Sequence, residues 1–340
     1  MSLILVTGGC GFIGRHVVEA LVRGGARVRV LDVGDPAGLP AGVEIHRASI
    51  LDAARLAEAM RGAAIVHHVA GISHFWTRRR ADLAQVNARG TAMVLEAAAA
   101  ARVRRVVHCS SATVLRTAGI GAGAPLHDLA EVETMPGPYT RSKREAEATA
   151  LAAAEAGLDV VIASPTVPIG ARDANRTPPA AMLAQFLDGG APAFLDCTLN
   201  LVGVRDVAAG MLLAAEHGRR GARYVLDGED VRLSDLLGRL ERLSGRRMPR
   251  LALPGAAARA VAALAEWTAD HVTGRPPVAT REGVRLALGE ARVGDSKARD
   301  ELGYRPAPID GPLAEAVRWL MAEPSAPCGA PAPRPSAKVA

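Results

Sequence analysis

A glycine-rich turn near the N-terminus is the feature that most constrains the fold. Residues 3–6 form a short apolar run, and TGGCGFIG follows at 7–14. Residues 15–25 then carry an apolar stripe at helical spacing that ends at a glycine pair, which predicts a helix. RVRVLD at 27–32 has the alternation typical of a strand. The order strand, glycine turn, helix, strand predicts a βαβ unit.

Such a turn suits the binding of a dinucleotide. Its glycines, Gly8, Gly11 and Gly14, allow a sharp bend and a close approach of backbone to phosphate, and the helix N-terminus attracts the anion. Asp32 ends the second strand, 18 residues after Gly14, where a carboxylate can accept bonds from ribose hydroxyls and repels a 2′-phosphate. No Arg follows it directly, so we expect NAD in preference to NADP. Alternatively, Asp32 starts a turn with Pro36 and Gly38.

Strand and helix patterns alternate up to about residue 165, which predicts an α/β fold with a doubly wound parallel sheet of the Rossmann type. The expected strands are 3–7, 27–32, 43–47, 64–69, 104–109 and 159–163. The expected helices are 12–24, 52–61, 82–101 and 138–157.

Composition argues against several other classes of protein. The net charge is +6, but the arginines are scattered and aromatic residues make up only 3 %, so no nucleic-acid partner is expected. The run 78–80 of three arginines reads as a solvated loop. No apolar run is long enough to span a membrane, and the apolar start lacks the basic leader of a signal peptide.

Cysteine usage points to the cytoplasm. The four cysteines lie far apart without CxxC spacing, which argues against a disulfide framework or a zinc site and fits a reducing compartment. They are Cys10, Cys109, Cys197 and Cys328. His67 and His68 end a strand without a nearby third ligand, so no metal site is expected.

One tyrosine and one lysine are placed for proton chemistry. The chain has three tyrosines and three lysines, and PYTRSK puts Tyr139 four positions before Lys143. These positions share one face of a helix, so the ammonium can reach toward the phenol and lower its pKa from about 10. A phenol tuned in this way is an acid and base near neutral pH. The alternative is an ordinary surface helix that starts after Pro138.

Taken together, these motifs resemble the extended short-chain dehydrogenase/reductase family, over about residues 1–322. Further matching motifs are HHVAG at 67–71, VNARGT at 86–91, VHCSSATV at 107–114 and VRDVAAG at 204–210. Within the family, SPTVPIGARD at 164–173 and LNLVGVRDVAAG at 199–210 are most similar to the hopanoid-associated sugar epimerase branch, itself similar to dihydroflavonol 4-reductases.

The resemblance implies a role for each matching residue. Ser111 would hydrogen-bond the reacting oxygen, Tyr139 would be the general acid and base, and Lys143 would hold the nicotinamide ribose and support the phenolate. Ser110 and Ser111 could instead be caps, and Asn87 either relays protons or pins two strands. The implied cofactor contacts are Gly8, Cys10, Gly11, Phe12, Ile13, Gly14, Asp32, Ser49, Ile50, Val69, Ala70, Gly71, Asn87, Cys109, Tyr139, Lys143, Pro165, Thr166 and Val167.

The chain also departs from the family pattern. Ser49 stands where many relatives carry an Asp that binds adenine. Ser164 and Val167 stand where nucleotide-sugar epimerases have Arg and Asn, and TLNLVGV at 198–204 lacks their diphosphate-clamping Arg. Asp32, in contrast, is unlike the basic residue of NADP-dependent dihydroflavonol reductases.

The expected organisation is a nucleotide-binding domain at 1–170, to which helix 206–217 returns, and a smaller, mostly helical substrate lobe at 171–203 and 221–322. The Pro/Ala-rich tail 323–340 is predicted to be disordered. In the loop after the fourth strand, His74, Phe75 and Trp76 form either an aromatic wall for the substrate or a local hydrophobic plug. The resemblance also implies a homodimer through helices 82–101 and 138–157.

These observations predict an NAD-dependent oxidoreductase that transfers hydride between the nicotinamide and a secondary alcohol or ketone. An alternative is a sugar or nucleotide-sugar epimerase or dehydratase that retains its NAD. A further alternative is a nucleotide-sensing protein without catalysis. The partner is in each enzymatic case a small molecule.

Overall fold

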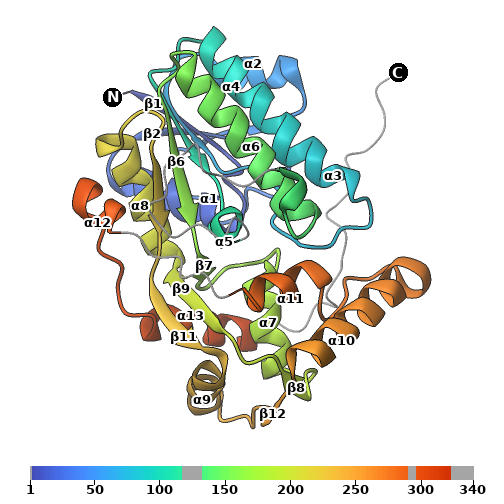
Figure 1. The fold of residues 1–340 in the computed structure, drawn as a ribbon. Coiled ribbons are helices and arrows are strands. Elements are labelled where there is room, and N and C mark those ends of the chain that lie inside the picture. The colour runs from blue at the N-terminus through green and yellow to red at the C-terminus, as the bar shows by residue number, and fades with distance from the viewer. Residues whose placement is uncertain (1, 117–131, 290–295, 323–340) are drawn as a thin grey trace.

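The computed structural model describes residues 2–116, 132–289 and 296–322 (Figure 1). The tail 323–340, predicted to be disordered, lies outside the described residues. Within the described ranges, no helix is both long enough and apolar enough to span a bilayer.

A seven-stranded parallel sheet forms the centre of the N-terminal half (Figure 1). Its order is β10-β6-β5-β4-β1-β2-β3, so the strand order reverses between β1 and β4, and the carboxyl ends of these two strands flank a crevice. The six strands predicted from the sequence are present, which confirms the Rossmann-type fold. The strands are β1 (Leu3–Thr7), β2 (Arg27–Asp32), β3 (Glu44–Arg47), β4 (Ala63–His68), β5 (Arg105–Cys109), β6 (Val160–Pro165) and β10 (Arg223–Leu226).

Helices cover both faces of this sheet because its central strands β1, β5 and β6 are buried on both sides. One face packs against α1 (Phe12–Arg23), α8 (Val204–His217) and α12 (Lys297–Leu302). The other packs against α2 (Ala53–Met60), α4 (Gly90–Ala100) and α6 (Pro138–Glu155). Two separate apolar cores result, one on each side of the sheet.

The predicted helix 82–101 is interrupted. It consists of a short α3 (Ala81–Leu83), a π-helical segment (Ala84–Arg89) and α4. The interruption coincides with Asn87, whose side chain makes contacts outside the helix, and with Thr91, whose hydroxyl donates to the Asn87 carbonyl at 2.6 Å. Such π segments are common at functional sites.

The C-terminal half adds a smaller lobe with its own apolar core. Its helices are α7 (Pro178–Leu187), α9 (Leu233–Ser244), α10 (Gly255–Thr268), a π-helical segment (Ala269–Thr273), α11 (Arg281–Ala287) and α13 (Asp310–Ala322). Its strands are β7 (Val167–Ile169), β9 (Thr198–Gly203) and β11 (Glu229–Arg232) in one sheet, with β8 (Ala193–Phe194) and β12 (Leu251–Ala252) in another. Short elements α5 (Thr113–Arg116) and a 3₁₀ turn (Val132–Thr134) precede α6.

Two elements within the range expected for the lobe pack elsewhere. β10 pairs in parallel with β6 and is the edge strand of the large sheet, because its four residues are all buried there. The α12 residues Ala298 and Leu302 lie in the core beneath that sheet. In the domain division that we propose, β10 and α12 therefore join the nucleotide-binding layer, and the lobe keeps the rest of 221–322.

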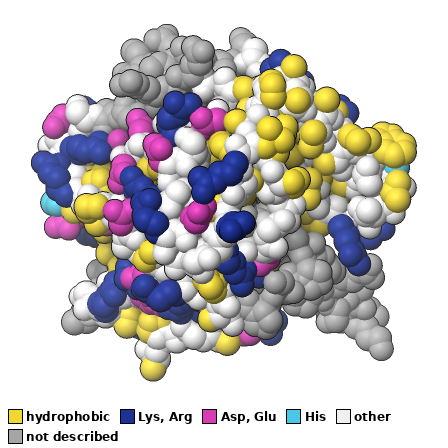
Figure 2. Space-filling view, turned by 90° about the horizontal axis from the view of Figure 1, so that it is seen from below, with side chains coloured by type: hydrophobic (Ala, Val, Ile, Leu, Met, Phe, Trp, Pro, Cys, Tyr) yellow, Lys and Arg dark blue, Asp and Glu magenta, His cyan; other side chains and the backbone are white. Residues whose placement is uncertain are grey.

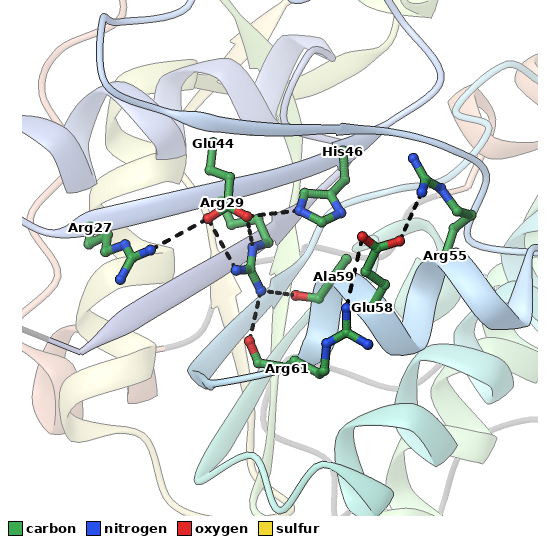
Figure 3. Close-up of polar contacts among 8 residues, drawn as sticks. All are labelled: Arg27, Arg29, Glu44, His46, Arg55, Glu58, Ala59 and Arg61. Atoms are coloured by element: carbon green, nitrogen blue, oxygen red, sulfur yellow. Dashed lines mark hydrogen bonds and ion pairs between the residues drawn. The ribbon is translucent and has the colours of Figure 1, made fainter.

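A cluster of charged side chains joins the strands at the β3 edge of the sheet (Figure 3). Glu44 on β3 accepts hydrogen bonds from Arg29 on β2 at 2.8 and 3.1 Å, and these bonds lower the pKa of its carboxyl group. Arg29 also donates to the carbonyls of Ala59 and Arg61, at the C-terminal end of α2. One arginine thus joins β2, β3 and α2, and β2 holds Asp32 at its far end.

Candidate active site

The glycine turn after β1 leaves no room for side chains. Gly8 has φ +74°, and a Cβ atom built there would lie 2.5 Å from the Ala70 nitrogen. A Cβ on Gly14 would lie 2.0 Å from the Gly8 carbonyl oxygen. Gly11 precedes the first turn of α1, which has no acidic residue. A closely packed backbone that leads into a helix N-terminus fits the pyrophosphate of a dinucleotide.

Asp32 lies beside this turn, at the carboxyl end of β2. Its two carboxylate oxygens accept the backbone N–H groups of Cys10 and Gly34, each at 2.8 Å. The carboxylate therefore joins the glycine turn to the loop after β2, and its remaining lone pairs suit ribose hydroxyls. Burial, followed by the Asp32 charge, raises the pKa of the Cys10 thiol to about 12, so Cys10 is a packing residue without nucleophilic character.

Of the other predicted cofactor contacts, three make polar bonds within the protein and one is packed in a core. Val69 and Ala70 donate backbone N–H groups to the carbonyl and hydroxyl of Thr7, at 3.1 and 3.4 Å, which places this segment beside the glycine turn. Ser49 uses its hydroxyl to accept the Leu51 N–H at 3.1 Å. Ile50, in contrast, is buried in the core on the α4 side, so its side chain packs there.

Asn87 pins the loop after β4 to α6. Its side-chain oxygen accepts the Ile72 N–H at 2.7 Å, and its Nδ2 donates to the Ile72 carbonyl and to the Ser142 hydroxyl, each at 3.0 Å. A Cβ atom on Gly71 would come within 3.0 Å of the Asn87 oxygen. The sequence suggested that Asn87 could pin two strands; the structure shows it pinning a loop and a helix.

Ser111, Tyr139 and Lys143 lie close together at the carboxyl end of β5. All three are buried. The Ser111 hydroxyl lies 2.9 Å from the Thr113 hydroxyl, and hydrogen bonding to Ser111 acts to lower the pKa of the Tyr139 phenol. Lys143, one turn along α6, donates from Nζ to the Cys109 carbonyl at 2.7 Å. Ala112 donates its N–H to the Pro165 carbonyl at 2.9 Å, and Thr166 donates to the Leu226 carbonyl at 3.3 Å. The segment from Pro165 to Val167 therefore runs beside Ser111.

The pKa of the phenol differs from the sequence-based prediction. Lys143 was expected to lower it, but burial raises the pKa of Tyr139 to about 12. The hydrogen bond with Ser111 acts in the lowering direction and the Glu282 charge in the raising direction. Burial also lowers the pKa of Lys143, because a buried ammonium loses its hydration. Desolvation, which a motif cannot reveal, is the largest influence on the pKa of each of the two groups.

Ser110 has a different partner from Ser111. Its hydroxyl donates to Glu147, a fully buried carboxylate that also forms an ion pair with the buried Arg223 of β10. Arg223 Nε donates to the same carboxylate at 2.7 Å. Glu147 follows Lys143 by four residues and so occupies the same face of α6. This spacing was visible in the sequence and could have revealed Glu147 as part of the site's support.

The aromatic loop after β4 faces both the phenol and the lobe. The Phe75 ring lies edge-on to the Tyr139 ring, with centroids 5.3 Å apart. Trp76 Nε1 donates to the Asp270 carboxylate at 2.8 Å, and His74 Nε2 lies 3.2 Å from the Asn175 carbonyl. Trp76 thus packs against the lobe, as a local plug would, and Phe75 stands beside the phenol; a wall for the substrate stays a prediction.

Glu282, a residue that sequence reasoning missed, caps the helix that carries Tyr139. Its buried carboxylate accepts the N–H groups of Tyr139 and Thr140 at 3.2 and 2.7 Å. A hollow of about 230 Å³ lies beside this contact. It is lined by Phe75, Arg80, Pro136, Gly137, Pro138, Glu266, Arg281, Glu282 and Arg285. Glu282 lies more than 140 residues from Tyr139 and Thr140 in the chain, so only the fold brings these residues together.

Three buried histidines lie near the carboxyl ends of β4 and β5: His67, His68 and His108. His68 is within hydrogen-bond distance of the hydroxyls of Thr7 and Thr91, at 2.8 and 2.9 Å, and its ring lies 5.3 Å from that of His108. Burial lowers the pKa of His67 to about 4 and that of His68 to about 3. Across the described ranges, no three His, Cys, Asp or Glu side chains gather as metal ligands would.

The chain matches a known family along most of its length. The model of the NAD dependent epimerase/dehydratase family matches residues 4–227. A putative dihydroflavonol 4-reductase of Synechocystis sp. is 35 % identical over 324 residues, which cover 93 % of each protein. Sterol demethylase protein B of Methylococcus capsulatus is 32 % identical, covering 93 % of this chain and 97 % of that protein.

Two further comparisons agree with these. A 4-hydroxy-2-methyl-3-oxo-4-farnesyl-3,4-dihydroquinoline-1-oxide ketoreductase of Stigmatella aurantiaca is 34 % identical, covering 88 % of this chain and 90 % of that protein. Among solved structures, the crystal structure of gox2253 is similar with a TM-score of 0.80 and 32 % identity, covering 94 % of this chain and 98 % of that one. The likeness therefore spans the sheet and the lobe together.

Proposed function

The chain belongs to the NAD dependent epimerase/dehydratase family and is an NAD-dependent enzyme, and from that premise we propose that it reduces a ketone or oxidises the corresponding secondary alcohol. One observation carries this proposal. The Tyr139 hydroxyl is buried beside the Ser111 hydroxyl, one helical turn before Lys143. A phenol and a hydroxyl that lie side by side can both bind one substrate oxygen.

In the proposed reaction, each side chain acts on that oxygen or supports a group that does. Ser111 donates a hydrogen bond to it, and Tyr139 exchanges a proton with it. Lys143 places a positive charge one turn along the same helix, near the carboxyl end of β5. NAD, held along the glycine turn, would supply the nicotinamide that accepts or donates hydride. Tyr139 carries its proton at neutral pH, as the donor to a carbonyl oxygen must.

The surroundings of Tyr139 support a lipophilic substrate. Phe75 packs against the phenol, and Ser164 and Val167 stand where epimerases place Arg and Asn. β9 offers no arginine to bind a sugar-nucleotide diphosphate. Two of the relatives above are named for a sterol and for a farnesylated ketone. We therefore propose an apolar, ring-bearing or prenyl-bearing ketone as the substrate class.

The decisive test replaces the phenol. Tyr139→Phe should reduce turnover of a hydrophobic ketone panel by about 10²–10⁴-fold, the contribution typical of a positioned acid, while the Kd for NADH stays nearly unchanged. Tyr304→Phe is the matched control, because the Tyr304 hydroxyl donates to the Asp227 carbonyl outside the site. Turnover of the Tyr139→Phe protein at the rate of the unmodified protein would contradict the proposal.

The same assay separates the other candidate activities. Net loss of NADH absorbance with product formation supports a reductase. Conversion of a nucleotide sugar by protein that retains its NAD, with no net change in absorbance, would instead identify an epimerase or dehydratase. Cofactor binding without turnover of any substrate would identify a nucleotide sensor.

We also propose a homodimer in the cytoplasm. α4 and α6 lie side by side on one face of the sheet (Figure 1), and each has exposed residues at helical spacing that a partner could cover. Cys10 and Cys109 are free thiols, which suits a reducing compartment. Light scattering of the purified protein measures the mass directly, and a monomer at micromolar concentration would contradict the dimer.

A further inference from the structure

The segment that includes α10 exposes an unusual concentration of large apolar side chains. Ten large hydrophobic residues are exposed in the described chain, and five of them fall between residues 261 and 278. They are Val261, Leu264, Trp267, Val272 and Val278, with exposed fractions of 45, 66, 53, 68 and 65 %. We call these five residues the α10 surface. Exposed apolar side chains that are concentrated in one segment indicate an interaction site.

The α10 surface is separate from the face by which α10 packs on the lobe. Ala258 and Ala262 are buried against Val284 of α11, and these residues form a small core of their own. Val261, Leu264 and Trp267 follow at three-residue spacing on another side of the helix. The Trp267 ring stacks on His271, with centroids 5.2 Å apart. The helix therefore has one apolar face that is partnered and one that faces solvent.

Charge around the α10 surface is positive. Arg259 and Arg275 are exposed, whereas Glu266 of the same segment is buried and accepts the Arg281 N–H. Asp270 is neutralised by Arg80, whose guanidinium lies 2.8 Å from it. In Figure 2, hydrophobic side chains gather on the right, Lys and Arg side chains border them, and the Asp and Glu side chains lie mostly on the other half.

We propose that the α10 surface docks on a lipid bilayer that contains anionic headgroups. An apolar helix face with a Trp and with arginines at its edge has the chemistry of an interfacial helix, which lies in the plane of the membrane. The indole ring suits the boundary between headgroups and acyl chains, and the guanidinium groups pair with phosphates. A symmetric dimer through the same surface would bring the arginines of both copies together, which disfavours a second copy as the occupant.

This inference stands on surface composition and does not depend on the catalytic assignment. Docking on a membrane would also bring the enzyme to the substrate class proposed above, because a lipophilic ketone dissolves in membranes. α10 packs on α11, and α11 carries Glu282, the cap of the Tyr139 helix. The docking surface and the site therefore belong to neighbouring helices of one lobe.

The test uses the full chain and vesicles of defined composition. We expect the protein to sediment with vesicles of phosphatidylcholine and phosphatidylglycerol in equal amounts, and much less with phosphatidylcholine alone. Binding should weaken as salt is raised, because the charge component is screened. The emission of exposed Trp267 should shift to shorter wavelength on binding, and Trp267→Phe should remove that shift. Equal failure to bind both kinds of vesicle would overturn the proposal.

A pair of variants separates docking from folding. Leu264→Asp combined with Val272→Asp should reduce the partition onto anionic vesicles by about tenfold or more, since two apolar contacts are replaced by charges. Leu243→Asp, at an exposed apolar residue of α9, is the matched control and should leave the partition unchanged. Both proteins should retain turnover of a water-soluble ketone. Unchanged vesicle binding by the double variant, or a lipid-free dimer that the double variant abolishes, would refute membrane docking.

Discussion

The carboxylate of Glu282 accepts the backbone N–H of Tyr139 at 3.2 Å, so a residue of α11 caps the helix that presents the phenol. The same carboxylate accepts the Thr140 N–H at 2.7 Å. A negative charge at this place stabilises the helix end but opposes formation of a phenolate nearby. The lobe therefore influences the acidity of Tyr139 through backbone contacts and charge.

Removing that charge should shift the pH profile of the reaction. Glu282→Gln keeps an acceptor for one N–H group but loses the negative charge, so the pKa of Tyr139 should fall. We expect the rise of alcohol-oxidation kcat with pH to move to lower pH. The other charged groups around this contact are Glu266 on α10, Arg281 and Arg285 on α11, and Arg80 on the aromatic loop. The profile of kcat against pH, with NAD saturating, measures the shift.

The control for this experiment is Glu266→Gln. Glu266 is also buried in the lobe, but it accepts the Arg281 N–H and makes no hydrogen bond to α6. Its removal should move the profile less than removal of Glu282. An unchanged profile in a folded Glu282→Gln protein would show that the cap has no influence on the phenol.

Asp32 should control the affinity for NAD. Asp32→Asn weakens acceptance of the Cys10 and Gly34 N–H groups and of the ribose hydroxyls, so KM for NAD should rise about tenfold with a smaller change in kcat. Fluorescence titration with NADH gives the matching Kd. Asp35→Asn is the control, because Asp35 is exposed and accepts the N–H of the nearby Ala37. Equal affinities in the two variants would argue against this ribose contact.

The buried Glu147–Arg223 pair should matter far more to stability than a surface pair. Arg223→Met leaves Glu147 buried without its counter-charge, which should cost about 3–5 kcal/mol of unfolding free energy. Arg219→Met breaks an exposed pair with Glu301 and should cost at most about 1 kcal/mol. Urea unfolding of both variants compares the two losses. Similar midpoints would mean that the buried carboxylate finds another partner or takes up a proton.

Acid should destabilise the protein through its buried histidines. Burial lowers the pKa of His67 to about 4, below its ordinary value of 6.5, so the unfolded chain binds protons first as the pH falls. The stability that a neutral His67 contributes is complete above pH 6.5 and declines toward pH 4, by about 1.4 kcal/mol per pH unit. Unfolding midpoints at several pH values measure this slope.

A substitution isolates the histidine contribution. His67→Leu cannot take up a proton at this position, so the dependence of stability on pH between 6.5 and 4 should become shallower by about 1.4 kcal/mol per pH unit, while the buried His68 and His108 keep their own contributions. His217→Gln, at a half-exposed position at the end of α8, should leave the slope unchanged. A slope that His67→Leu does not alter would assign acid sensitivity to other groups.

The sequence predicted the parts of the fold that depend on local order. Most of the first six strands are short apolar or alternating runs beside a glycine or a helix signal, and the glycine spacing at 7–14 predicts the turn there. Tyr139 and Lys143 lie on one helix, so their common face followed from spacing alone. Ser111 joins them because parallel strands present their carboxyl ends at one edge.

Other features depend on contacts that spacing cannot encode. Glu282 and Phe75 reach Tyr139 from distant parts of the chain. The short strands of the lobe, such as β7 with three residues, are too brief to leave a period in the sequence. The direction of the Tyr139 pKa shift depends on how deeply the phenol is buried, a property of the packed molecule rather than of the PYTRSK motif.

The backbone passes between the large sheet and the lobe at several places, among them β6 to β7, β9 to α8, β10 to β11 and α12 to α13. A swing about a single hinge would have to bend all of these connections together, so opening and closing should proceed by small sliding of packed elements. Limited proteolysis at one connection should accordingly leave both halves associated, held by the remaining crossings.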